Sequence, residues 1–185
     1  MEDWRSGGFG LYLHWPFCQS KCPYCDFNSH VAATIDQRRW RDAYLAEIRR
    51  VSDETKGRTL QTVFFGGGTP SLMTGEQVAG VIGEIDRLWG LKPGAEITLE
   101  ANPDDVARFA DFAAAGVNRL SLGLQSLNDE SLRLLGRDDL NGAMLGLNHR
   151  MAQGREIQVR KDVPLDQIKD CTMAFVGDSD ARILP

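Results

Sequence analysis

The segment Cys18-Gln-Ser-Lys-Cys22-Pro-Tyr-Cys25 decides the predicted fold, and it directly follows the apolar run Leu11–Phe17. Three of the four cysteines of the chain lie within it. A short loop with this spacing can direct three thiolates toward one metal or cluster site. Three cysteines are one fewer than the four that hold an ordinary iron–sulfur cluster. We therefore expect one metal to keep an open coordination position, as the metal does in catalytic zinc sites.

Other interpretations of these cysteines remain open on spacing alone. A disulfide would leave one of the three unpaired, and no secretory signal points to an oxidising compartment. A structural zinc site would need a fourth ligand, for which His14 or His30 is available. Cys22 and Cys25 could also form a redox dithiol. The open iron–sulfur cluster is favoured over each of these.

The composition is that of an ordinary water-soluble domain. The chain has 185 residues, of which 42% are hydrophobic and 25% charged, with a net charge of -5. This charge provides no electrostatic footprint for DNA or RNA. No apolar run approaches the roughly 18 residues of a membrane span, although peripheral membrane contact stays open. The N-terminus lacks the layout of a signal peptide, so we expect a cytoplasmic location, which suits clustered thiols.

Four units, each a strand followed by a helix, succeed one another along the chain. The expected strands are residues 11–17, 62–65, 96–100 and 118–125. Thr34, Thr74 and Asn128 are the expected N-caps of three helices, and Gln77 completes a capping box with Thr74. The remaining helix is expected to start at Asn102-Pro103, with Val106, Phe109, Ala110 and Ala113 on its apolar face.

This order of elements predicts an α/β fold with parallel strands joined by crossovers. We expect part of a (β/α) barrel of the TIM type, with an open doubly wound sheet as the second choice. The cysteine loop, the glycines at 66–68, Glu100 and Gln125 all fall at or just after strand ends. In parallel barrels the chemistry lies at that face.

The pattern weakens after Asp138. One further helix is expected up to Gly154, and residues 156–160 and 172–176 are weaker strand candidates. A complete barrel usually needs about 250 residues, which this sequence does not supply. We therefore divide the chain into a core at 1–137 and a divergent tail at 138–185, in which Cys171 is expected to be a free thiol.

Several motifs together resemble the radical S-adenosylmethionine (SAM) superfamily. They are Tyr12-Leu-His-Trp-Pro-Phe-Cys18, the spacing of the three cysteines with Tyr24 before the last, Phe64-Phe-Gly-Gly-Gly-Thr-Pro-Ser71, Leu99-Glu-Ala-Asn-Pro103 and Arg119-Leu-Ser-Leu-Gly-Leu-Gln-Ser126. Within the superfamily the sequence is similar to the branch of oxygen-independent coproporphyrinogen III oxidases and HemW-type haem chaperones. The resemblance covers about residues 10–137.

The resemblance implies roles for individual residues. Cys18, Cys22 and Cys25 would bind three irons of a [4Fe-4S] cluster, and the amino and carboxylate groups of SAM would chelate the fourth. An electron passed to the SAM sulfonium would then break a carbon–sulfur bond. The residues that would contact SAM are Tyr12, Gly66, Gly67, Gly68, Thr69, Glu100, Gln125 and Arg137. No family role falls on His14 or His30.

Two departures distinguish the members of this branch. The oxidases carry another cysteine two positions after the third motif cysteine, where this chain has Phe27, and they have a longer segment before the cluster. Both departures favour a HemW-type protein that binds haem and passes it to an acceptor protein, with an electron donor as a further partner. The alternatives are an oxygen-independent coproporphyrinogen III oxidase, a truncated or frameshifted chain without complete activity, and a structural zinc module.

Overall fold

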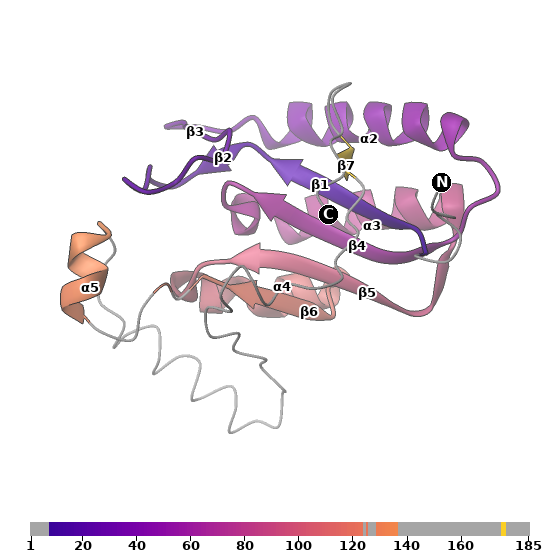
Figure 1. Cartoon of the computed structure of the whole chain (residues 1–185). Coiled ribbons are helices and arrows are strands. Elements are labelled where there is room, and N and C mark those ends of the chain that lie inside the picture. The colour runs from indigo at the N-terminus through magenta and orange to yellow at the C-terminus, as the bar shows by residue number, and fades with distance from the viewer. Residues whose placement is uncertain (1–7, 124, 126–128, 137–174, 177–185) are drawn as a thin grey trace, which may run out of the picture.

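A parallel β-sheet lies at the centre of the computed structural model, which describes residues 8–123, 125, 129–136 and 175–176 (Figure 1). The strand order is β6-β5-β4-β1-β7, and each of these neighbouring pairs is parallel. The strands are β1 (Gly10–Trp15), β4 (Leu60–Gly67), β5 (Leu91–Ala101), β6 (Arg119–Leu122) and β7 (Phe175–Val176). The predicted α/β fold with parallel strands is thus confirmed.

Helices connect the successive strands and cover one face of the sheet (Figure 1). They are α2 (Gln37–Glu54), α3 (Gly75–Trp89) and α4 (Phe109–Ala114). Alternate strand residues point to this face, and they are buried against the helices. Leu11, Leu13 and Trp15 of β1 form the first such row, and Val63, Phe65, Ile97 and Leu99 of β4 and β5 extend it.

A short parallel pair encloses the cysteine loop. Pro16 ends β1 as expected, and β2 (Phe17–Cys18) pairs with β3 (His30–Val31). Phe17 lies opposite His30, and the His30 N–H donates to the Pro16 carbonyl at 2.7 Å. The two ends of the segment that carries the three cysteines therefore lie side by side, after the end of β1.

The predicted start of α2 is wrong by two residues. Asp36, not Thr34, is the N-cap, because its carboxylate accepts a hydrogen bond from the Arg39 N–H at 3.0 Å. The capping box of α3 is confirmed: Thr74 and Gln77 exchange side-chain-to-backbone hydrogen bonds.

The segment after β5 also differs from its prediction. A 3₁₀ helix, η2 (Pro103–Arg108), precedes α4, and a 3₁₀ helix turns once in three residues rather than 3.6. The apolar face is therefore rotated from the expected position. Phe109 and Phe112 are buried, whereas Ala110 and Ala113 are exposed.

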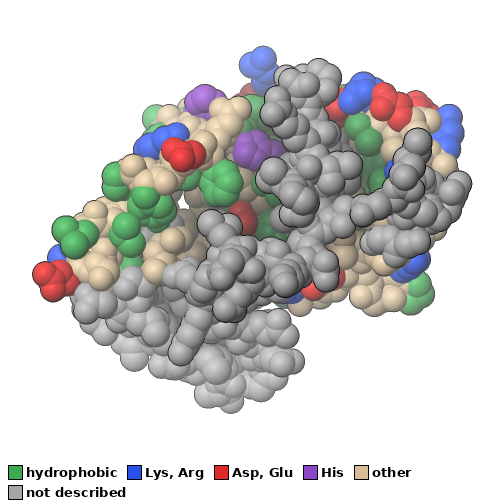
Figure 2. Space-filling view, in the orientation of Figure 1, with side chains coloured by type: hydrophobic (Ala, Val, Ile, Leu, Met, Phe, Trp, Pro, Cys, Tyr) green, Lys and Arg blue, Asp and Glu red, His purple; other side chains and the backbone are tan. Residues whose placement is uncertain are grey.

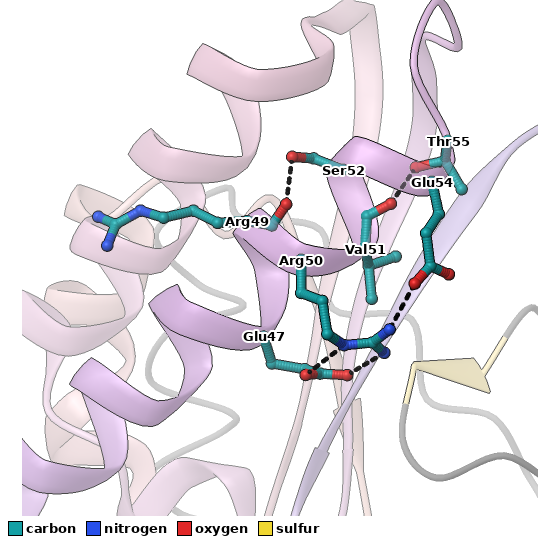
Figure 3. Close-up of polar contacts among 7 residues, drawn as sticks. All are labelled: Glu47, Arg49, Arg50, Val51, Ser52, Glu54 and Thr55. Atoms are coloured by element: carbon teal, nitrogen blue, oxygen red, sulfur yellow. Dashed lines mark hydrogen bonds and ion pairs between the residues drawn. The ribbon is translucent and has the colours of Figure 1, made fainter.

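Helix α2 is held by its inner face rather than by its surface charges. Arg50 pairs with Glu47 at 2.7 Å and with Glu54 at 2.5 Å on the solvent side (Figure 3). Exposed pairs of this kind contribute little to stability. On the opposite side, Ile48 is buried and Tyr44 packs against the core.

The later part of the chain is described only at β7, where Tyr12 and Leu13 pair with Phe175 and Val176. This strand falls within the predicted strand at 172–176. The predicted helix up to Gly154, the strand at 156–160 and Cys171 lie outside the described residues, so the boundary between 1–137 and 138–185 stays a prediction. Among the described helices, none combines the length and apolarity that a membrane crossing requires.

We expect Leu99→Ala to lower the free energy of unfolding by about 2–5 kcal/mol, because removing a fully buried side chain leaves a cavity. Leu134 of α5 (Asp129–Leu134) is 79% exposed and provides the matched control. Leu134→Ala should change stability by less than about 0.5 kcal/mol. Chemical denaturation measures both variants, and equal losses would contradict the placement of Leu99 in the core.

Candidate functional site

The carboxyl ends of the strands open onto a pocket of about 410 Å³. Its walls contain eight of the predicted site residues, namely Cys18, Cys22, Cys25, Gly67, Gly68, Thr69, Glu100 and Gln125. Figure 2 shows hydrophobic side chains gathered over β2, the cysteine loop and α5 at this end of the molecule. Tyr12 and Gly66 are not part of the pocket wall, and Arg137 lies outside the described residues.

All three cysteines are free and half-buried. The loop turns tightly between the last two, where the Cys25 N–H donates to the Cys22 carbonyl at 3.1 Å. In the described part of the chain, no three Cys, His, Asp or Glu side chains are grouped as ligands of a single metal ion. A single zinc ion requires such a grouping, whereas the thiolates that hold a [4Fe-4S] cluster bind separate irons.

The side chains of His14 and Lys21 hold the end of the cysteine loop at residues 27–29. The His14 Nε2 lies 3.0 Å from the Asn28 carbonyl, to which it donates as the protonated nitrogen. The Lys21 ammonium lies 3.5 Å from the Phe27 carbonyl and 3.4 Å from the Ser29 carbonyl. His14 is thus engaged by the loop backbone, which removes its Nε2 as a metal ligand in this arrangement. The sequence did not reveal this positioning contact.

Gly66 makes room for two aromatic rings on the face of the sheet opposite the helices. A Cβ at this position would lie 2.8 Å from ring atoms of both Tyr12 and Phe64. These rings stack with centroids 5.8 Å apart, because Tyr12 and Phe64 are register partners. Burial, aided by the charge of Glu100, raises the pKa of Tyr12 to about 12, so its phenol stays protonated near neutral pH.

Gly67 and Gly68 approach neighbouring atoms so closely that no side chain fits. Gly67 has a φ of +111°, and a Cβ there would lie 2.5 Å from the His14 Nδ1. At Gly68 a Cβ would lie 2.5 Å from the Phe17 carbonyl oxygen. The Gly68 N–H donates to Trp15 at 2.7 Å. These glycines fasten the end of β4 to the entrance of the cysteine loop; contact with SAM remains a prediction for them.

Glu100 is a half-buried carboxylate near the end of β5. One of its oxygens, Oε2, accepts a hydrogen bond from the Gly67 N–H at 3.1 Å. Burial raises the pKa of Glu100, and the hydrogen bond from Gly67 opposes this only partly. The carboxylate lies in the pocket wall opposite Ser121 in the register, where it can accept hydrogen bonds from a bound ligand.

Gln125 adopts a left-handed backbone conformation with a φ of +62°. Among the described residues it is the one non-glycine with positive φ. Such a conformation costs roughly 1–2 kcal/mol for an L-residue and is frequent at binding sites. Its place in the pocket wall agrees with the position expected from the sequence.

Comparisons with known proteins identify the family to which the chain is similar. The family model for the radical SAM superfamily matches residues 12–150. The mitochondrial radical S-adenosyl methionine domain-containing protein 1 of Bos taurus is 45% identical over 129 residues, which are 69% of this chain and 29% of that protein. The haem chaperone HemW of Haemophilus influenzae is 43% identical over 134 residues, covering 69% of this chain and 35% of its own.

A solved structure is similar as well. The coproporphyrinogen III oxidase HemN of Escherichia coli, described as a radical SAM enzyme, superimposes with a TM-score of 0.71 at 29% identity. The match covers 80% of this chain and 35% of HemN. The chain thus spans about a third of the length of the proteins it matches.

We expect Glu100→Gln to stabilise the chain at neutral pH. Glutamine keeps an oxygen that can accept the Gly67 N–H but carries no charge to bury. Since burial raises the folded-state pKa of Glu100 above the ordinary 4.5, the parent loses stability as the pH rises from about 4.5 through that raised value. The melting temperature of Glu100→Gln should therefore exceed that of the parent at about pH 8, and the difference should shrink near pH 4. An equal difference at both pH values would contradict a half-buried, ionised carboxylate.

Proposed function

The chain belongs to the radical SAM superfamily, and from this membership we propose that Cys18, Cys22 and Cys25 hold a [4Fe-4S] cluster beside a SAM site. The observation that carries the proposal is the pocket itself, which three free cysteines line together with strand-end glycines and Glu100. The donor set fits, since soft thiolates are the ligands that iron–sulfur clusters take from proteins. Three of them leave one iron for a ligand other than cysteine.

When bound, the cluster and SAM supply one-electron chemistry that cleaves a carbon–sulfur bond of SAM. The chain contributes binding, orientation and exclusion of water. Glu100 would accept hydrogen bonds from the polar end of SAM, and the backbone at Gly67, Gly68 and Thr69 would form the adjacent wall. Gln125 and, from the resemblance alone, Arg137 would be the further polar contacts, and Tyr12 would support the floor of the site from one residue layer below.

Within the superfamily we assign the chain to the HemW type, which in this proposal binds haem and delivers it to an acceptor protein. Two observations support the assignment. Phe27 occupies the position of the additional oxidase cysteine, and HemW proteins of Haemophilus influenzae and Escherichia coli are 43% and 42% identical over the matched region. An electron donor is the second proposed partner, and the proposed location is the cytoplasm.

Coproporphyrinogen oxidation is the second candidate function. The likeness to HemN, with a TM-score of 0.71, supports it. Phe27 argues against it, because a phenyl ring provides no thiol at that position and is 58% exposed beside the pocket.

Anaerobic reconstitution of the full chain with iron and sulfide should yield about four irons and four sulfides per chain. The variant with Cys18, Cys22 and Cys25 all changed to alanine should lose the cluster absorbance, because no other thiol is left in the described pocket wall. Cys171→Ala provides the matched control and should keep the parent spectrum. Uptake of iron and sulfide by the triple variant would refute the ligand assignment.

Haem titration of the reconstituted chain, followed by size exclusion, distinguishes the two functions. A haem chaperone should elute with haem, whereas coproporphyrinogen supplied with SAM and a reductant should remain unchanged. Decarboxylated product would instead favour the oxidase. The triple cysteine variant, run in parallel, shows whether haem retention depends on the cluster.

A further inference from the structure

Two neighbouring loops line the pocket. The first follows β4 through Gly68 and Thr69 into the 3₁₀ helix η1 (Pro70–Leu72). The second follows β5 through Asn102 into η2. Residues 67–70 of the first loop and 100–104 of the second both line the pocket. The spacing of the two loops in the pocket wall therefore depends on what joins them.

The inner join is a single hydrogen bond. The Gly67 N–H donates to the Glu100 Oε2 at 3.1 Å. Glu100 is also the carboxylate that the proposed function assigns to the ligand. Because ligand binding would compete for the Glu100 carboxylate, this hydrogen bond alone cannot hold the two loops at a constant distance.

The outer join holds Ser71 by its side chain and by its backbone. The Ser71 hydroxyl donates to the Asp105 Oδ2 at 2.5 Å, and the Asn102 N–H donates to the same oxygen at 3.2 Å. The Arg108 guanidinium donates to the Ser71 carbonyl through Nη1 and to the Met73 carbonyl through Nη2 at 2.7 Å. Ser71 has no exposed surface, so these bonds form away from solvent. Hydrogen bonds to charged groups are stronger than those between neutral groups.

The form of η2 explains how two side chains reach one serine. Residues three apart are eclipsed in a 3₁₀ helix, so Asp105 and Arg108 project from the same face. The Arg108 guanidinium also lies 5.6 Å from the centroid of the Phe112 ring, which restricts its orientation. Asp105 and Arg108 are therefore placed by η2 and α4 together.

We propose that Asp105 and Arg108 are positioning residues for the SAM pocket: through Ser71 they fix the spacing between the glycine loop and the end of β5. The inference rests on the proposed function of this site. Neither side chain needs to touch SAM, since each acts through Ser71. The hydrogen bonds of Asp105 and Arg108 with Ser71 do not involve Glu100. They therefore persist when Glu100 binds a ligand.

The test measures SAM affinity of the reconstituted full chain, together with its iron and sulfide content and its melting temperature. Ser71→Ala and Arg108→Ala should each weaken SAM binding about tenfold, because a hydrogen bond to a charged group is lost from the wall. Their iron and sulfide content should equal that of the parent, since none of the hydrogen bonds removed runs to residues 18–25. Asp105→Asn keeps an acceptor oxygen and should stay within about threefold of the parent, whereas Asp105→Ala should match Ser71→Ala.

Amide hydrogen exchange of the unloaded chain provides a readout that does not require SAM. Exchange over residues 66–73 should rise in Ser71→Ala and Arg108→Ala, while exchange in the middle of α2 stays unchanged. Arg87→Ala is the matched control: Arg87 lies in the last turn of α3 and pairs with Glu84 at 2.8 Å. It should alter neither SAM affinity nor exchange at 66–73. Should Asp105→Ala not fold, Ser71→Ala and the comparison of Arg108→Ala with Arg108→Lys still decide the question.

Three results would overturn the inference. If Ser71→Ala and Arg108→Ala bind SAM as tightly as the parent, the positioning role is wrong, but the proposed function stands. Loss of iron together with SAM affinity would show a general structural role instead. A parent chain that takes up iron and sulfide but binds no SAM would overturn the proposed SAM site and this inference with it.

Discussion

The contact on which the site depends is the close approach of the glycine run to the backbone that enters the cysteine loop. Gly68 donates to the Trp15 carbonyl at 2.7 Å, and Thr69 donates to the Phe17 carbonyl at 2.6 Å. A Cβ at Gly68 would lie 2.5 Å from the Phe17 oxygen, so any side chain would force the two segments apart. Because Cys18 is the next residue after Phe17, this contact fixes the origin of the thiol-bearing loop relative to the end of β4.

The electrostatics of the pocket work against stability and for ligand binding. Burial raises the pKa of Glu100, so keeping this carboxylate ionised costs free energy that one hydrogen bond from Gly67 does not recover. Burial of Tyr12 and the charge of Glu100 raise the pKa of Tyr12 to about 12, so its phenol stays neutral beside Glu100. Residues that cost stability at a pocket are expected where binding, not folding, requires them. A cationic or hydroxyl-bearing ligand would supply what Glu100 lacks in the described structure.

Local pattern predicted the parts of the fold that local forces determine. The strands, the parallel order and the Thr74–Gln77 capping box follow from periodicity and from residues three apart. The meeting of the cysteine loop, Gly67 and Glu100 followed from the rule that the ends of parallel strands share an edge. Pairing register, which depends on tertiary structure, placed Tyr12 one layer below the pocket. The contacts of Arg108 with Ser71 and of His14 with Asn28 join distant residues, for which the sequence carries no signal.

The two halves of the site differ in how far the chain orders them by itself. The glycine-loop side is built from strand ends. Its Ser71 is fully buried and is held by charged side chains of η2. On the cysteine side, by contrast, most residues between Cys18 and Asn28 are exposed. Ligands that are already in place lower the cost of binding, whereas thiolates in an exposed loop are ordered at the expense of metal-binding energy. If the proposed function holds, cluster binding would restrict an exposed loop, whereas SAM would meet a wall that the chain already holds in place.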